Sequence, residues 1–207
     1  MRALFIGISC LISSFFLCQQ KEEFRLVKSY YNQHRSLLNK EFRKKFDAEP
    51  NTFKKATIKG DFLYFMKKMD SIENTALIGA LLKVRNLEDL QAIKAMKEMP
   101  QVMPEKPVDI ETVPNYPGGI NTLRQEVANL IYVGGVHSEV KTIKTSVAFI
   151  VEKDGSISNV HAQGDNFTFN RQAEIALYSI SEKFLPAIAK GDSARFHFRL
   201  PLTLTLE

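Results

Sequence analysis

The sequence is poor in cysteine, and its two cysteines lie where neither a disulfide nor a catalytic thiol is expected. Cys10 and Cys18 belong to the apolar N-terminal segment or to its end. The rest of the chain therefore has no disulfide framework and no thiolate nucleophile. Histidines are also few, and no two of them have the spacing of a metal site on one helix face. They are His34, His137, His161 and His197. We expect neither a metal nor a cofactor.

Catalytic and nucleotide-binding patterns are missing as well. No carboxylate pair and no Ser-His-Asp arrangement stands out from the background, so nothing in the sequence supports an enzyme. The glycine pairs Gly118-Gly119 and Gly134-Gly135 do not join a hydrophobic strand to a helix in the order that a phosphate-binding loop needs. No strand combines aromatic and basic residues in the manner of RNA-binding proteins. We expect a protein that is not an enzyme and binds no nucleic acid.

The charge of +5 is unevenly placed along the chain. Residues 21–107 hold 18 Lys and Arg against 12 Asp and Glu, whereas residues 108–207 hold 9 against 11. Because acids are interspersed with the basic residues, the pattern is typical of a solvated helix surface. A patch for anionic lipid or another polyanion is the alternative.

Residues 1–18 are interpreted as a secretory signal peptide. Arg2 is followed by an apolar run from Ala3 to Leu17, which is shorter than the roughly 20 apolar residues that span a bilayer. The alternative is a buried N-terminal helix. Cys18 ends the run as the lipid-attachment cysteine of a bacterial lipoprotein does, and it is the candidate lipid anchor. Simple cleavage near Cys18 is the other outcome, since Leu17 is larger than the residue such signals carry. Either outcome predicts export.

Residues 19–99 are predicted to be mostly helical. Breaks are expected at Pro50-Asn51, at Gly60-Asp61 with Asp61 as a helix cap, and at Asn86, which would cap a short last helix. The first helix is amphipathic and needs a partner, because its apolar residues recur on one face. They are Phe24, Val27, Tyr31, Leu38 and Phe42. Aromatic and Met stripes in this region are interpreted as core packing rather than as a cofactor pocket.

Residues 100–115 are predicted to be a linker. Five of the eight prolines fall between Pro100 and Pro117, with charged residues among them. Such a composition is typical of an extended segment. The linker would separate the helical region from a C-terminal domain, residues 116–207.

The C-terminal domain has the pattern helix, strand, strand, helix, strand. Apolar residues at helical spacing precede Gly134-Gly135, and Asp154-Gly155 between two β-type runs predicts a hairpin. Asn170 is the expected cap of the second helix, and Pro186 its expected end. We predict an α+β fold: a three-stranded antiparallel sheet with two helices on one face, preceded by a mostly α-helical region.

The last strand, residues 193–206, alternates strictly between apolar and polar side chains. One face holds Phe196, Phe198, Leu200, Leu202, Leu204 and Leu206. This alternation predicts a strand with one buried face. Pro201 lies within it and has no N–H to give to a ladder, so we expect an edge strand or a bulge at this point. An exposed edge is either guarded against other chains or used to bind one.

These patterns resemble the C-terminal domain of TonB, the energy transducer of outer-membrane transport, in the form common among Bacteroidetes. The resemblance runs from Tyr116 to Leu206. It rests on Tyr116-Pro117-Gly118-Gly119, Val151 to Ile157, Asn170 to Ala176, Lys183 to Ala187, Gly191 and Phe198 to Leu202. It implies a periplasmic domain that binds a short peptide from the N-terminus of an outer-membrane transporter, in support of transmembrane transport.

In that family the peptide pairs with the last strand, which implies the partner-binding residues here. These are Arg195, His197, Phe198, Arg199, Leu200 and Thr203. Arg195 and Arg199 are the expected contacts for acidic groups of the partner, and the alternative is that their charges only discourage aggregation. The short apolar N-terminus and the brief linker indicate a stand-alone domain without a motor connection. A structural or self-associating protein, such as a homodimer paired through this strand, is the competing hypothesis.

Overall fold

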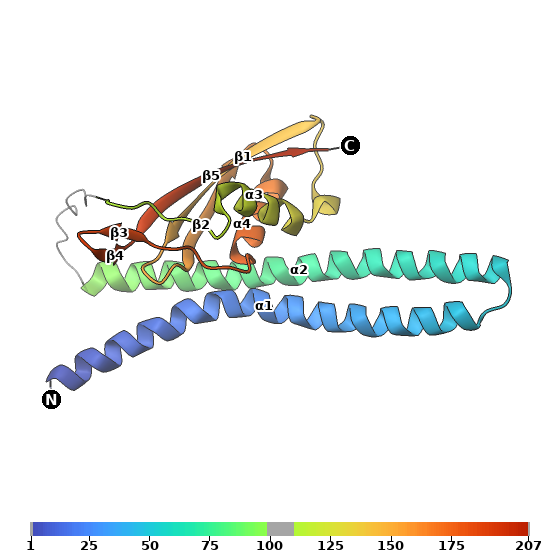
Figure 1. Cartoon of the computed structure of the whole chain (residues 1–207), viewed down its shortest axis with the longest axis horizontal. Helices are drawn as coiled ribbons and strands as arrows, with labels where there is room; N and C mark the ends of the chain where they lie inside the picture. Colours follow the sequence, from blue (N-terminus) through green and yellow to red (C-terminus); the bar gives the residue numbers. More distant parts are fainter. Residues whose placement is uncertain (1, 99–109, 207) are drawn as a thin grey trace.

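The computed structural model describes residues 2–98 and 110–206; of residues 2–21 and 96–98 it describes the backbone alone. As predicted, the protein is α+β, with a helical first half and a three-stranded antiparallel sheet in the second (Figure 1). The described elements are α1 (Arg2–Ala48), α2 (Thr52–Glu98), α3 (Gly119–Leu130), the 3-10 turn η1 (Val133–Gly135), β1 (Thr142–Val151), β2 (Ile157–Gly164), α4 (Phe167–Tyr178), β3 (Ala187–Ala189), β4 (Asp192–Ala194) and β5 (Phe196–Thr205).

Helices α1 and α2 form a long antiparallel hairpin. The break predicted at Pro50-Asn51 is confirmed, and Asn51 Oδ1 accepts a hydrogen bond from the Lys54 N–H at 3.0 Å. The breaks predicted at Gly60-Asp61 and at Asn86 are wrong, because α2 runs through both positions. Gly60 and Asn86 are exposed, and a glycine inside a helix costs only about 1 kcal/mol relative to alanine. Packing against α1 offsets such a penalty.

The apolar face predicted for the first helix packs against α2. Phe42 stacks on Phe62 with ring centroids 4.1 Å apart. Further along the hairpin, Arg35 forms ion pairs with Asp70, at 2.6 Å, and with Glu73. The expected partner of the amphipathic helix is therefore α2.

Strand order in the sheet is β2-β1-β5, with both pairs antiparallel. The hairpin predicted at Asp154-Gly155 is confirmed as the connection of β1 to β2. Gly155 has φ 77°, and a Cβ at this position would lie 1.9 Å from the carbonyl oxygen of Phe184. Only glycine meets both requirements of this turn.

Helix α4 packs against β1 and β2 on one face of the sheet, and α3 packs against α4. The cap of α4 is Asn166, not the predicted Asn170: Asn166 Oδ1 accepts a hydrogen bond from the Phe169 N–H at 2.8 Å. The helix ends at Tyr178, well before Pro186, where we expected its end. The apolar stripe predicted for this segment is nevertheless buried. It comprises Ala173, Ala176, Leu177, Ile180 and Phe184.

A small hairpin of β3 and β4 precedes the last strand, so the strand predicted over residues 193–206 is divided at Arg195. Residues 110–115, the last part of the predicted linker, bind this hairpin: the Ile188 N–H donates to the Thr112 carbonyl at 2.9 Å. We refer to residues 110–206 as the C-terminal unit. Residues 100–109 of the predicted linker lie outside the described residues.

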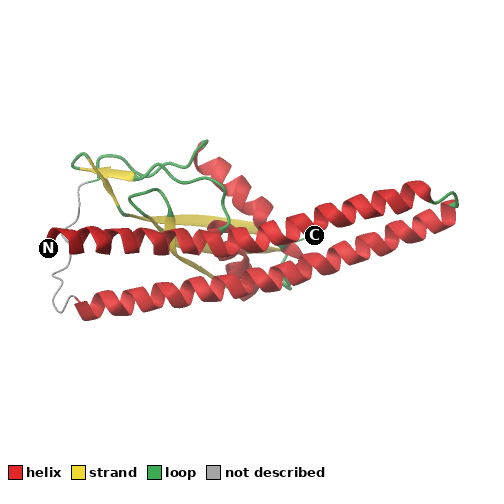
Figure 2. Ribbon diagram, turned by 90° about the horizontal axis from the view of Figure 1, so that it is seen from below, coloured by secondary structure: helices red, strands yellow, loops and turns green. Residues whose placement is uncertain are grey.

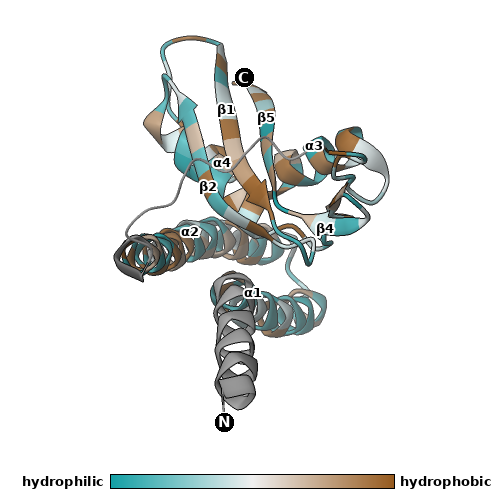
Figure 3. Ribbon diagram, turned by 90° about the vertical axis from the view of Figure 1, so that its left-hand side faces the viewer, coloured by the Kyte–Doolittle hydropathy of each residue, from teal (hydrophilic) through white to brown (hydrophobic). Residues whose placement is uncertain are grey.

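The hairpin and the C-terminal unit share one core. Phe24 of α1 stacks on Tyr178 of α4 with ring centroids 5.4 Å apart, and Leu81 and Val84 of α2 are buried in the same cluster. Figure 2 shows the helices lying along the C-terminal unit, and Figure 3 shows β2 as the strand of the sheet that lies nearest to α2. The helical region is thus packed on the domain rather than held away from it.

None of the helices, over the residues that the structure describes, combines the length and the apolar character needed to cross a membrane. The predicted signal peptide, residues 1–18, falls where side chains are not described. The same holds for its candidate anchor, Cys18.

Candidate functional site: the two edges of the sheet

Strand β5 is one edge of the sheet, and its ladder to β1 shows which backbone groups face outward. The register is regular from Thr142–Thr205 to Val151–Phe196. Beyond it, the Leu206 N–H donates to the Lys141 carbonyl at 2.8 Å. Backbone groups of an antiparallel strand alternate between its two sides. Even-numbered residues of β5 therefore bond to β1, and odd-numbered residues direct their N–H and C=O groups outward.

Pro201 is one of the outward residues. Its missing N–H falls on the free side of the strand, so the ladder to β1 loses no hydrogen bond. The edge-strand prediction made from Pro201 is confirmed, and the register continues through it without a bulge.

The outward groups of β5 have no hydrogen-bond partner in the part of the chain that the structure describes. His197, Arg199 and Thr203 are exposed on the polar face of this strand. Two of the predicted site residues are placed differently: Leu200 is fully buried in the core, and Phe198 is partly buried. Both have even numbers, so their N–H groups belong to the ladder with β1.

Arg195 lies just before β5 and is held by the domain itself. Its Nη2 and Nε lie 2.8 Å from Glu152 Oε1 and Oε2, respectively, a two-pronged ion pair. The Ser158 hydroxyl donates to the same carboxylate at 2.6 Å. Arg199 forms no ion pair with the described residues, which leaves its guanidinium available to a partner.

An aromatic cluster packs on the apolar face of β5. The Phe198 ring packs on Phe149 at 5.2 Å and on Phe184 at 5.8 Å, and Tyr116 meets Phe184 edge-on at 5.1 Å. The cluster packs the apolar face of β5 against the core and holds the edge strand in place.

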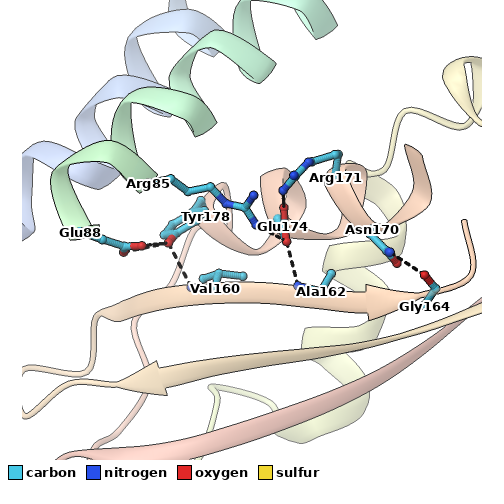
Figure 4. Close-up of polar contacts among 9 residues, drawn as sticks. All are labelled: Arg85, Glu88, Val160, Ala162, Gly164, Asn170, Arg171, Glu174 and Tyr178. Carbon is cyan, nitrogen blue, oxygen red and sulfur yellow. Dashed lines mark hydrogen bonds and ion pairs between the residues drawn. The ribbon is translucent and has the colours of Figure 1, made fainter. Parts of the chain in front are cut away.

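Strand β2 is the other edge, and side chains of the helices bind several of its outward groups, above all the N–H groups (Figure 4). The Val160 N–H donates to the Tyr178 hydroxyl at 3.1 Å, and that hydroxyl donates to Glu88 of α2 at 2.8 Å. At the bulge of β2, the Asn159 N–H donates to Glu88 Oε1 at 2.9 Å.

Two further groups of β2 are occupied by α4. The Ala162 N–H donates to Glu174 Oε1 at 2.8 Å, and Asn170 donates to the Gly164 carbonyl at 2.8 Å. Glu174 is only 1% exposed and also pairs with Arg85 of α2 and with Arg171. We call the set Arg85, Glu88, Asn170, Glu174 and Tyr178 the β2 guard.

Burial dominates the electrostatics of the guard. It raises the pKa of Glu88 above its ordinary value, against the hydrogen bonds from Asn159 and Tyr178 that lower it. Burial also raises the pKa of Glu174, although Arg171 opposes the shift. The pKa of Tyr178 is raised by burial and by the Glu88 carboxylate, so its hydroxyl keeps its proton and can donate.

Sequence reasoning missed the guard. Its central acid, Glu174, is a buried partner of two arginines, and it is not among the residues that the sequence predicted to be functional. The signal was present, because Glu174 interrupts the apolar stretch from Ala173 to Leu177. An acid inside such a stretch indicates a buried polar contact.

Among the described residues, no three His, Cys, Asp or Glu side chains lie close enough together to hold a metal ion. Comparison of the chain with protein-family models, with curated proteins and with solved structures found no match.

Proposed function

We propose that the C-terminal unit binds an extended segment of a partner protein, which adds to the sheet along β5. The observation that carries the proposal is the difference between the two edges. The guard occupies the outward N–H groups of Val160 and Ala162 and the Gly164 carbonyl of β2, whereas the outward groups of β5 have no partner in the described chain. Backbone pairing would supply the affinity, and flanking side chains the specificity.

The partner that the TonB resemblance implies is the N-terminal peptide of an outer-membrane transporter, bound in the periplasm. The motif order from Tyr116 to Leu206 and the position of the last strand at the sheet edge support this choice. The protein would then assist transport across the outer membrane as a cell-envelope protein without enzymatic activity.

The residues along β5 also favour one pattern of partner sequence. Side chains of an added strand on the polar face would lie beside His197 and Arg199, and those on the other face beside the partly buried Phe198 and Leu204. A segment that alternates acidic or polar with apolar residues fits both faces.

The test is an NMR titration of the full chain with peptides of about a dozen residues from the N-termini of outer-membrane transporters. We use the full chain because the C-terminal unit shares its core with the hairpin. Chemical-shift changes concentrated on residues 196–205 are expected. A folded chain that shows no change with any such peptide contradicts the proposal.

A matched pair of variants sharpens this test. Arg199→Pro removes one outward N–H, whereas Arg199→Ala removes the same charge and keeps the N–H. Strand addition predicts that the proline variant binds about fivefold more weakly than the alanine variant, since one hydrogen bond contributes about 1 kcal/mol. Proline at Phe198 or Leu200 would be uninformative, because their N–H groups bond to β1.

Self-association is the second candidate, and the same free edge favours it, because two copies of β5 can pair antiparallel about a twofold axis. Size-exclusion chromatography with light scattering, which measures the mass of the particle in solution, distinguishes the two functions. A dimer that the Arg199→Pro variant disrupts, with no response to peptides, would establish the structural role.

A further inference from the structure

The net positive charge of the protein is concentrated at one place, the closed end of the helical hairpin. Residues 40–68, which we call the hairpin tip, hold nine Lys and Arg and four Asp and Glu. The rest of the chain holds 19 of each, so the tip carries the whole net charge of +5. A field of one sign, confined to one end of the molecule, favours an anionic partner.

Large apolar side chains are exposed at the same place. Phe53, at the turn, is 83% exposed, and Tyr64 is 62% exposed. Leu63 and Phe65 are more than half exposed. Removing apolar surface from water is favourable by about 25 cal/mol per Å², so binding these side chains to an apolar partner would lower the free energy.

Charged and apolar groups are interleaved on the tip rather than separated. Lys54 and Lys55 follow Phe53 directly, the Lys55 ammonium lies 5.0 Å from the centre of the Phe46 ring, and that of Lys68 lies 4.8 Å from the Tyr64 ring. A lysine whose alkyl stem lies along an aromatic ring covers apolar surface while its ammonium group stays in the polar phase. Such a pair suits a surface where an apolar layer meets a polar one.

The C-terminal unit does not supply the cover. The hydrogen bonds that join the hairpin to this unit come from Asn74, Arg85 and Glu88, on the other side of residue 68. Figure 1 shows the tip extending beyond the C-terminal unit. The exposed residues of the tip therefore face solvent in the isolated chain.

We propose that the hairpin tip docks on an anionic lipid bilayer. Such a surface offers phosphate groups to the ammonium groups and, directly beneath them, an apolar layer to the aromatic side chains, which a flat acidic protein surface does not. The interfacial zone of a bilayer favours aromatic residues flanked by lysines. The helical half would then hold the β5 edge at a membrane, and this inference does not rest on the proposed function of that edge.

The first test is co-sedimentation of the full chain with vesicles. Vesicles of 30% phosphatidylglycerol in phosphatidylcholine should bind more protein than vesicles of phosphatidylcholine alone, which report any contribution of the apolar N-terminus. The double variant Lys54→Glu/Lys55→Glu should bind anionic vesicles at least about 25-fold more weakly, since each lysine near the surface contributes about fivefold and the new carboxylates are repelled. The matched control is Lys94→Glu/Lys190→Glu, which makes the same change in net charge at exposed sites outside the tip.

The second test uses the absence of tryptophan from the sequence. The Phe53→Trp variant carries a single fluorescent reporter at the turn, and its emission should shift to shorter wavelength with anionic vesicles. Leu90→Trp, on an exposed site of α2 outside the tip, should show no shift.

Three results would overturn the proposal. The first is equal binding to anionic and neutral vesicles, and the second is an equal loss of binding in the two double variants. The third is a pair of observations: the emission of Phe53→Trp does not shift with anionic vesicles, and soluble polyaspartate displaces the protein from them. That result would identify an acidic polymer, not a bilayer, as the partner.

Discussion

The two edges of the sheet differ in what covers them rather than in their strands. Both β2 and β5 pair with β1, and both have outward backbone groups. Those of β2 meet a carboxylate, a hydroxyl and an amide from α2 and α4, whereas those of β5 meet nothing in the described chain. Whether an edge is open thus depends on the helices packed beside it as much as on the strand itself.

The largest effect is expected from removing the centre of the guard. Glu174→Ala leaves Arg85 and the Ala162 N–H without their shared acceptor in a buried site. The expected loss is about 3–5 kcal/mol of unfolding free energy, measured by urea denaturation, because an uncompensated buried charge remains. The control Glu139→Ala removes an exposed carboxylate and should stay within about 0.5 kcal/mol of the parent. A loss below about 1 kcal/mol for Glu174→Ala would mean that solvent replaces the guard.

A smaller loss is expected from Tyr178→Phe, which keeps the ring stacked on Phe24 and removes only the hydroxyl. The Val160 N–H then lacks its acceptor, and the expected loss of stability is about 1–3 kcal/mol. Tyr64→Phe removes an exposed hydroxyl and is the control. Equal melting temperatures for the two variants would show that the hydroxyl does not guard the strand.

At the open edge, Arg199→Glu should leave stability nearly unchanged and alter binding alone. We expect acidic peptides to bind about fivefold more weakly and basic peptides more tightly, because the charge that faces the added strand is reversed. Calorimetric titration of the parent and the variant with both peptides measures the change. Identical affinities would place the partner elsewhere than on the polar face of β5.

The smallest effect concerns pH. Since burial raises the pKa of Glu88, the folded protein binds more protons there than the unfolded chain does between the ordinary pKa and the raised one. The contribution of Glu88 to stability is therefore present below that window and is lost as the pH rises through it. Glu88→Gln should flatten this part of the stability profile. A variant profile parallel to that of the parent would assign the slope to other groups.

Local signals in the sequence predicted β5 well. Strict alternation identified its buried face, and Pro201 identified its free side, because each effect acts within one strand. The turn at Asp154-Gly155 was predictable for the same reason. The position of Arg195 was not, since its ion pair with Glu152 depends on a residue 43 positions away in the chain.

Helix boundaries were predicted less well, because packing outweighed local preference. Asn86 and Gly60 are weak breakers, and packing carries α2 through both. The packing is against α1 near Gly60, and against α4 and β2 next to Asn86. Asn166 and Asn170 stand one helical turn apart, and each has the chemistry of a cap. The Gly164 carbonyl engages Asn170, and Asn166 is left to cap α4, a choice that only the folded sheet decides.

The β2 guard also bears on the order in which contacts form during folding. The contacts of α2 that complete it join residues 71, 89 and 90 positions apart, whereas the contacts of α4 with β2 span only 6 to 18 positions. Contacts across long loops form late, so the Asn159 N–H stays uncovered until α2 docks, after α4 has covered Val160, Ala162 and Gly164. During that interval the β2 edge is only partly protected, and two unfinished chains can join through the strand that is closed in the finished one. The yield of refolding should accordingly fall as protein concentration rises.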